Sequence, residues 1–199
     1  MKRAMRWTWA ALVLALSCAA AAGGGEAAEA AAAAREPTLR KIHLEVDSEA
    51  KERIEHFRAR LPAELRRMNN FAWAKADIKG LRKKEYFAHS RIQGLGGLSW
   101  GAARKIRSIS PKPELAAARF ETLIVDYLGN VGGPNAIPRW FDTEYKILED
   151  VASRLPDPSA TGKILLYTDL EPCPSCRGVM RQFLAAYTNV EMEVIYAWP

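Results

Sequence analysis

Cysteine and histidine are scarce in this chain: there are three of each among 199 residues. The cysteines are Cys18, Cys173 and Cys176. A structural zinc site normally has four protein ligands, and no fourth cysteine or well-placed histidine accompanies the pair near the C-terminus. The composition therefore argues against a zinc ion whose only role is structural. No internal repeat is present either, so the sequence fits one domain preceded by a leader.

Long apolar runs are missing apart from Trp7–Ala22, which follows the basic residues of Met1–Arg6. The run is short for a membrane span and leads into a segment rich in alanine and glycine. This pattern predicts an export signal over residues 1–22, a linker over residues 23–37, and no transmembrane span in the mature chain. We therefore expect a secreted or extracytoplasmic protein. Cys18 leaves two alternatives open: a lipid anchor, or a cysteine lost with the leader.

The net charge of +6 is unevenly distributed. Residues 35–107 contain 18 Lys and Arg against nine Asp and Glu, whereas residues 108–199 contain eight against 12. A basic half favours a polyanionic partner, because phosphate contacts come mostly from Lys and Arg. The alternative for Ser48–Arg67 is a solvated helix face with alternating charges. The turn Arg82–Lys84 is the better phosphate candidate.

The rest of the pattern predicts an α/β protein. Large and small side chains alternate in Phe71–Ile78, which favours a strand, and Glu85–Ser90 forms a hairpin with it. Ser48–Asn70 has helical spacing, with Ser48 as a cap. The other expected elements are a short strand within Thr38–Val46, a strand in Phe120–Leu128, a helix in Asp142–Leu155, a strand at 163–170, a helix at 174–187 and a strand at 190–198.

Cys173 and Cys176 form a Cys-x-x-Cys pair at the last predicted junction of a strand with a helix. At a helix N-terminus, the dipole and free N–H groups favour the thiolate form. Both dithiol redox chemistry and zinc binding use this arrangement. A thioredoxin-like domain continues through several elements after its pair, whereas only 23 residues follow Cys176 here. This favours zinc, and leaves an exported thiol–disulfide protein as the alternative.

Two thiolates need a third ligand if the zinc is to be catalytic with an open position for water. Asp142 opens the predicted helix 31 residues before Cys173, a distance that fits a helix, a loop and a strand. Both helix N-termini would then lie at one edge of the sheet. Glu144 would stand beside the water as a proton shuttle. Alternatives are that Asp142 only caps its helix, that Glu144 is an ordinary first-turn acid, or that His89 is the ligand and Asp142 orients it.

Three pieces of sequence together carry a family resemblance: Phe87-Ala-His-Ser, Asp142-Thr-Glu-Tyr and Leu166–Cys176, which ends in Pro-Cys-Pro-Ser-Cys. They resemble the zinc-dependent cytidine deaminase-like superfamily, whose motifs pair His/Cys-x-Glu with Pro-Cys-x-x-Cys. Among its members they look most like the deaminase domains of bacterial polymorphic toxins. The resemblance covers residues 65–199, which leaves residues 38–64 as a basic helical extension. One departure is that Asp142 stands where the family usually has His or Cys.

The resemblance implies a three-layer α/β/α fold with an N-terminal β-hairpin and a mixed sheet. It also implies a Zn²⁺ ion held by Asp142, Cys173 and Cys176, with Glu144 as the catalytic proton shuttle. The implied activity is hydrolytic deamination of cytosine to uracil in single-stranded nucleic acid by a secreted bacterial toxin. The implied partners are a nucleic acid or nucleotide and an immunity protein, with the chain itself a monomer. A non-enzymatic, zinc-stabilised nucleic-acid-binding module is a further alternative.

Residues that face the substrate are expected on the hairpin and before the catalytic helix. We expect His89 and Ser90 to contact the substrate, and Trp140 to provide a platform on which a base stacks. Phe87 and Phe141 are expected in the core instead. Nothing in the sequence separates DNA from RNA or from a free nucleoside, and cytosine is favoured over adenine by the resemblance alone.

Overall fold

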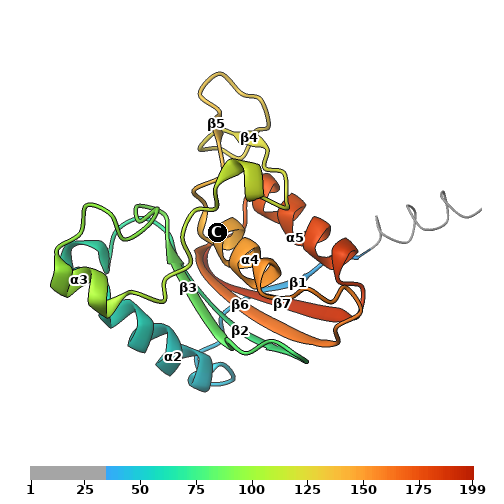
Figure 1. Cartoon of the computed structure of the whole chain (residues 1–199). Helices are drawn as coiled ribbons and strands as arrows, with labels where there is room; N and C mark the ends of the chain where they lie inside the picture. The colour runs from blue at the N-terminus through green and yellow to red at the C-terminus, as the bar shows by residue number, and fades with distance from the viewer. Residues whose placement is uncertain (1–34) are drawn as a thin grey trace, which may run out of the picture.

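The computed structural model describes residues 35–199 (Figure 1). The predicted export signal, Cys18 and most of the predicted linker lie outside these residues. Within the described range, no helix combines the length and the apolar character that crossing a membrane requires.

A five-stranded sheet forms the centre of the fold, with the strand order β1-β7-β6-β2-β3. β1 and β6 are both parallel to β7, whereas β2 is antiparallel to β6 and to β3. The sheet is therefore mixed, and the predicted hairpin of β2 and β3 is confirmed. The strands are β1 (Thr38–Lys41), β2 (Phe71–Ile78), β3 (Glu85–His89), β6 (Gly162–Leu170) and β7 (Val190–Trp198).

Helices cover both faces of the sheet (Figure 1). α4 (Thr143–Ser153) and α5 (Pro174–Ala186) pack on one face, and α2 (Ser48–Ala59) packs on the other. β2 shows why the two faces differ, because its side chains alternate between them. Its alanines contact the α4 side, while Phe71 and Trp73 contact the α2 side. The predicted three-layer α/β/α architecture is confirmed.

α4 is the most deeply buried helix of the described chain. All residues from Thr143 to Ala152 are buried, including the charged ones. The small side chains of β2 allow α4 to lie close to the sheet, and α5 packs beside it. A buried charged residue needs a hydrogen-bonding partner. Each charged residue of α4 is therefore expected to have polar groups around it.

The predicted strand in Phe120–Leu128 is largely wrong. Only Ile124–Val125 (β4) is extended and paired, with β5 (Ile137–Pro138). The preceding backbone is satisfied by side chains instead of a strand: Phe120 N–H donates to Glu149, and Leu123 N–H donates to Ser175. The other short elements are α3 (Trp100–Lys105) and the 3-10 turns Ala63–Leu65 and Leu115–Ala117.

The N-terminal part of the described chain is integrated into the same domain. β1 pairs with β7, and α2 buries Ala50, Ile54 and Phe57 against the sheet. The predicted cap Ser48 is wrong by one residue, because Asp47 occupies the N-cap position of α2. Its carboxylate accepts hydrogen bonds from Arg40 and from the backbone N–H of His43. Residues 38–64 thus build one edge and one layer of the domain.

Candidate active site

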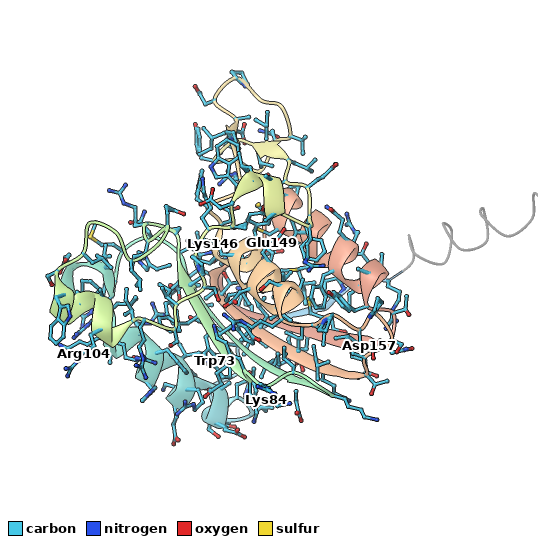
Figure 2. All side chains as sticks on the ribbon, viewed as in Figure 1. Trp73, Lys84, Arg104, Lys146, Glu149 and Asp157 are labelled. Atoms are coloured by element: carbon cyan, nitrogen blue, oxygen red, sulfur yellow. The ribbon has the colours of Figure 1, made fainter. Side chains whose placement is uncertain are left out.

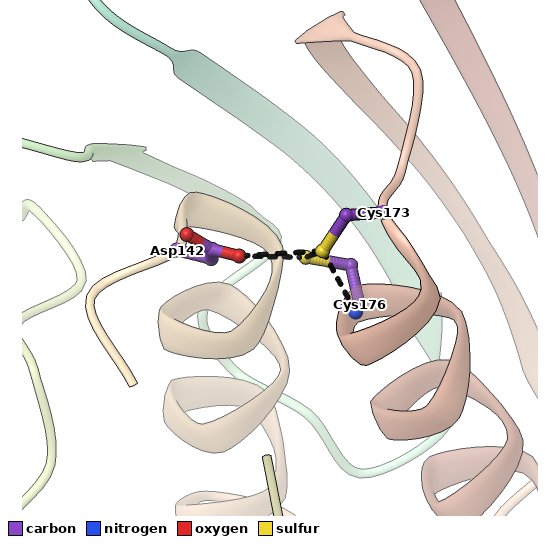
Figure 3. A group of neighbouring side chains, drawn as sticks. All are labelled: Asp142, Cys173 and Cys176. Carbon is purple, nitrogen blue, oxygen red and sulfur yellow. Dashed lines mark hydrogen bonds between the residues drawn. The ribbon is translucent and has the colours of Figure 1, made fainter. Parts of the chain in front are cut away.

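α4 and α5 begin at the same end of the sheet and bring three potential metal ligands together (Figure 3). Oδ2 of Asp142 lies 3.6 Å from Sγ of Cys173 and 3.3 Å from Sγ of Cys176. The two sulfur atoms are 3.5 Å apart and both cysteines are free. Within residues 35–199, this is the one group of three His, Cys, Asp or Glu side chains close enough to hold a metal ion.

The spacing of these atoms fits a zinc ion. For tetrahedral zinc with usual bond lengths, two sulfur ligands lie about 3.8 Å apart, and a sulfur and an oxygen ligand about 3.5 Å apart. The observed distances of 3.5 Å between the sulfurs and 3.3 to 3.6 Å from oxygen to sulfur are within a few tenths of these values. Asp142, Cys173 and Cys176 are therefore able to hold one zinc and leave a fourth position open.

Asp142 occupies the N-cap position of α4 without capping it. Its side chain makes no hydrogen bond to the first turn of the helix, although this is the usual role of an aspartate there. The carboxylate points to the two cysteines, with the guanidinium of Arg139 at 3.9 Å from its other oxygen. Burial raises the pKa of Asp142. A buried carboxylate that turns away from its own helix is consistent with a ligand role.

The two cysteines occupy the first turn of α5. Cys173 is the N-cap residue, and its sulfur accepts the backbone N–H of Cys176. Pro174 follows at the first helical position, where its fixed φ suits the helix and its missing N–H is not needed. The hydrogen bond between the sulfurs lowers the pKa of Cys173 and raises that of Cys176, which burial raises further. Within the pair, the thiolate form is thus favoured at Cys173 over Cys176.

Glu144 is 2 % exposed and is held by hydroxyl and amide groups from three parts of the chain. Thr143 donates to its Oε2 at 2.7 Å, and Thr168 on β6 donates to its Oε1 at 3.0 Å. Asn70, just before β2, lies 3.4 Å from Oε2 and also donates to Thr168. Burial, followed by the nearby charge of Asp142, raises the pKa of Glu144. These contacts fix the carboxylate beside the ligand group, whereas burial and the charge of Asp142 favour its protonated form.

A pocket of about 270 Å³ opens above these residues. Asp142, Glu144 and both cysteines form its floor, and Ser90 and Phe141 lie in its wall. The remaining lining residues are Asn69, Asn70, Arg139, Leu170 and Glu171. The sequence-predicted Ser90 therefore lies in the wall of this pocket, with its Oγ accepting the backbone N–H of Asn70.

His89 does not face this pocket, and its predicted contact with the substrate needs correction. The ring is fully buried, and Nε2 lies 3.0 Å and 2.9 Å from the carbonyl oxygens of Leu65 and Met68. Nδ1 accepts the backbone N–H of Arg91. Both nitrogens are thus used within the protein, and burial lowers the pKa of the ring. His89 anchors the segment before β2 to the end of β3, and is not placed to bind the metal.

Trp140 and Phe141 each lie where the sequence predicts the other: the sequence predicts Trp140 at the substrate and Phe141 in the core. Trp140 packs against the hydrophobic core, with the ammonium of Lys112 5.5 Å from its ring centre. Phe141 is the aromatic side chain in the pocket wall. The two residues lie in the turn before α4, where Asp142 N–H donates to the carbonyl oxygen of Arg139. This turn directs Trp140 to the core and Phe141 to the pocket. The base platform assigned to Trp140 is therefore not supported.

Three polar residues near the site were not predicted from the sequence. Asn70 and Thr168 hold Glu144, as described above. Lys146 is fully buried one turn after Asp142 and donates to the carbonyl oxygens of His89 and Ile92. Burial lowers the pKa of Lys146 to about 7. The only signal in the sequence was a polar or charged residue inside or beside an otherwise apolar element.

The turn Arg82–Lys84, predicted as a phosphate-binding site beside the pocket, lies at the wrong end of the sheet. β2 and β3 pair Phe71 with His89 at the pocket end, so their connection is at the opposite end. Figure 2 shows Lys84 far from Lys146 on α4. Lys83 and Lys84 are also committed to ion pairs with Asp150 and Asp77. The position of the turn is fixed by the hairpin itself.

Comparison with known protein families gives a match over most of the described residues. A family model of toxin deaminases, described as the BURPS668_1122 family of deaminases, matches residues 54–198. No curated protein and no solved structure matches the chain. The matched range includes both helices that carry the site and four of the five strands of the main sheet.

Proposed function

The chain belongs to this family of toxin deaminases, and on that premise we propose that it is a zinc-dependent enzyme that converts cytosine to uracil in single-stranded nucleic acid. The family supports a hydrolytic deaminase of the cytidine deaminase-like kind. The metal, the base and the polymer are the parts that we propose.

One observation supports the metal most directly: the carboxylate of Asp142 completes the Cys173–Cys176 pair. A thiol–disulfide protein has no use for a third ligand atom at this distance from both sulfurs. A structural zinc site would need a fourth protein ligand, and both ring nitrogens of His89 are bonded elsewhere. Three ligands beside a pocket are typical of a catalytic site.

The chemistry divides between the metal and the chain. When bound, zinc supplies a water whose pKa is lowered toward neutrality and which serves as the nucleophile. Attack of the water oxygen on C4 of cytosine would break the bond from C4 to the exocyclic nitrogen and release ammonia. Glu144 would accept the two protons of the water in turn, delivering the first to the ring nitrogen and the second to the leaving amine. Thr143, Thr168 and Asn70 hold the carboxylate in position for both transfers.

The pocket is suited to one base presented at the protein surface. Ser90 and Asn69 line it with polar groups, and Phe141 provides a ring for stacking. A base in a duplex is not accessible to such a pocket, so a polymeric substrate must be single-stranded or have the base flipped out. We propose Phe141 rather than Trp140 as the aromatic contact.

The sequence and the family support our proposals on secretion and partners. The predicted export signal at residues 1–22 supports a secreted toxin, and a lipid anchor at Cys18 is the alternative to its removal. We also propose an immunity protein as a partner, which would protect the nucleic acid of the cell that makes the toxin. We propose that the protein acts as a monomer, since both ligand helices and Glu144 belong to one chain.

The test compares the full chain with the Glu144→Gln variant. We expect about one zinc per chain in both proteins by elemental analysis. Only the unchanged protein should produce uracil when incubated with single-stranded DNA, RNA or cytidine, because the amide of the substituted side chain accepts no proton. Chromatography that also detects hypoxanthine would identify an adenine substrate.

Two controls separate the alternatives. Cys176→Ala should lose both zinc and deaminase activity, whereas a thiol–disulfide protein would reduce insulin and lose that activity in the same variant. If the Glu144→Gln protein formed uracil as fast as the unchanged one, Glu144 would not be the proton shuttle. A chain that binds zinc but yields no deaminated base from any of these substrates would contradict the proposal.

A further inference from the structure

A second polar region lies around α3, away from the ligand group. A hollow of about 550 Å³ there is lined by four basic residues and by no others: Arg60, Arg104, Lys105 and Arg107. Arg60 follows α2, and the other three come from the end of α3 and the residues after it. Figure 2 labels Arg104 on this side of the molecule. We refer to these four residues together with Trp100 as the α3 patch.

The basic residues of the α3 patch have no acidic partner among residues 35–199. None of the four takes part in an ion pair, although several arginines of α2 and α5 do. Burial, and the charge of Arg107 after it, lowers the pKa of Arg60. Like charges that gather without a counter-ion cost free energy, which an anionic ligand would offset.

Arg60 is held rigidly in this place. Its Nε donates to the carbonyl oxygen of Lys105 at 2.7 Å. Its guanidinium also lies over the rings of Phe57 and Phe87, at 5.3 Å and 5.4 Å from their centres. A planar guanidinium that is fixed in this way can form hydrogen bonds to a phosphate with little loss of side-chain freedom.

Trp100 adds an aromatic surface to the charges. It is 76 % exposed, the most exposed tryptophan of the described chain. The guanidinium of Arg104 lies over its ring at 5.1 Å. Proteins that bind single-stranded nucleic acid combine such exposed aromatic rings, on which bases stack, with cations that contact the backbone.

The chain between the pocket and α3 also carries a hollow. It is lined by Asn69, Ser90, Arg91, Gln93 and Phe141 and has a volume of about 380 Å³. Three of these residues, Asn69, Ser90 and Phe141, also line the pocket. Arg91 is exposed and has no ion pair within the described residues. The hollow thus extends the pocket along the segment that leads to α3.

We propose that the α3 patch is a second binding surface for single-stranded nucleic acid, at which the substrate strand is held outside the catalytic pocket. The cations contact phosphates and the ring of Trp100 stacks on a base. The inference rests on the proposed function only in naming the bound strand as the substrate. It predicts that affinity increases with strand length beyond what the pocket itself can hold.

Binding is measured in the Glu144→Gln background, by fluorescence anisotropy with labelled single-stranded oligonucleotides of about three and about 20 nucleotides, lengths below and above the site sizes usual for such surfaces. The test variant is Arg104→Gln/Lys105→Gln/Arg107→Gln. The matched control, Lys51→Gln/Lys79→Gln/Arg82→Gln, removes the same charge from exposed residues without ion pairs, away from the α3 patch. We expect a loss of at least about tenfold for the longer strand in the test variant, and less than about threefold in the control.

Salt dependence and Trp100 give independent measures. Each phosphate contact contributes about 0.7 to the slope of log K against log salt for a single strand, so the test variant should lose a slope of about 2. Trp100→Ala should weaken binding of the longer strand about tenfold, and Trp100→Phe should restore most of it, since a stacked base depends on an aromatic ring. Circular dichroism and melting temperature identify any variant that is not folded. The single Trp100 variants, at an exposed position, then carry the test.

Several outcomes would overturn the inference. Equal losses in the test and control variants would show that only net charge matters. Competition by polyglutamate as effective as that by DNA or RNA, with no effect of Trp100→Ala, would indicate an acidic protein as the ligand. If the unchanged protein formed uracil but the α3-patch variants bound the strand as tightly as it does, the inference would be refuted and the deaminase proposal would stand. If binding depended on the α3 patch but no base were deaminated, the binding surface would be supported and the proposed deaminase function refuted.

Discussion

Asp142 and Cys176 are 34 residues apart in the sequence, yet Oδ2 of Asp142 lies 3.3 Å from Sγ of Cys176. The carboxylate reaches this position by leaving its own helix uncapped. The orientation removes the simplest alternative for Asp142, a residue that is present only to cap α4. It also gives a clear way to separate the role of Asp142 in metal binding from its role in folding.

Asp142→Ala should lose zinc and activity while the metal-free protein keeps its stability. Replacing an aspartate at an N-cap usually costs about 1 kcal/mol, but no capping hydrogen bond is lost here. We expect the free energy of unfolding in the presence of a chelator to change by less than about 0.5 kcal/mol. Asp157→Ala, at an exposed position, is the control for metal content. Zinc retained in Asp142→Ala would show that the ligand is another residue.

Thr168→Val should lower kcat about tenfold without changing zinc content, because general acid–base catalysis depends on the positioning of its carboxylate. Valine has nearly the same shape as threonine but cannot donate to Oε1 of Glu144. KM should change little, because Thr168 does not line the pocket. Thr161→Val, at an exposed position, is the matched control. An unchanged kcat in Thr168→Val would mean that Thr143 and Asn70 suffice to hold Glu144.

The His89→Gln variant should still bind zinc, and its free energy of unfolding should fall less at acid pH than that of the unchanged protein. Burial lowers the pKa of His89, so the unfolded chain takes up a proton at a higher pH than the folded one. Stability therefore falls as the pH drops below about 6.5, the value for an unperturbed histidine. Denaturation curves measured from about pH 7.5 to about pH 5 should show a steeper loss of stability for the unchanged protein than for the variant. Parallel losses, or loss of zinc, would contradict the structural role assigned to His89.

Lys146→Met should change the response to alkaline pH in the metal-free protein. The folded pKa is lowered to about 7, so between that value and the unfolded one of about 10.4 the unfolded chain holds one more proton. The stability of the unchanged protein should therefore rise with pH relative to the variant, by up to about 1.4 kcal/mol per pH unit. Chemical denaturation with chelator at about pH 7, 8 and 9 measures this difference. Stabilities that change in parallel would mean that Lys146 keeps its charge when buried.

The sequence predicts the strands and helices around the site well because their periodicity is strong. The hairpin of β2 and β3, the ligand helices and the last two strands follow from alternation, helical spacing and the Pro-Cys-x-x-Cys run. The strand expected at Phe120–Leu128 failed for a different reason. Glu149 and Ser175, both distant in sequence, accept hydrogen bonds that a neighbouring strand would otherwise accept.

The directions in which side chains point at the site could not be predicted from the periodicity of the sequence. Trp140 and Phe141 are adjacent aromatic residues, and which one faces the pocket depends on the path of the loop before α4. His89 is buried by a loop whose position no local pattern specifies. The place of Arg82–Lys84, in contrast, could have been deduced, because a hairpin with His89 at one end must turn at the other.

The parallel pairing of β1 with β7 has a practical consequence. A fragment that followed the family match and began at residue 54 would lack β1 and the first half of α2. β7 would then present an unpaired row of backbone N–H and C=O groups, and an unprotected strand of this kind is a template for aggregation. Loss of the first half of α2, including the buried Ala50, would also expose apolar side chains on the face of the sheet that α2 covers. The folding unit of this toxin therefore begins before Thr38, upstream of the region by which the family is recognised.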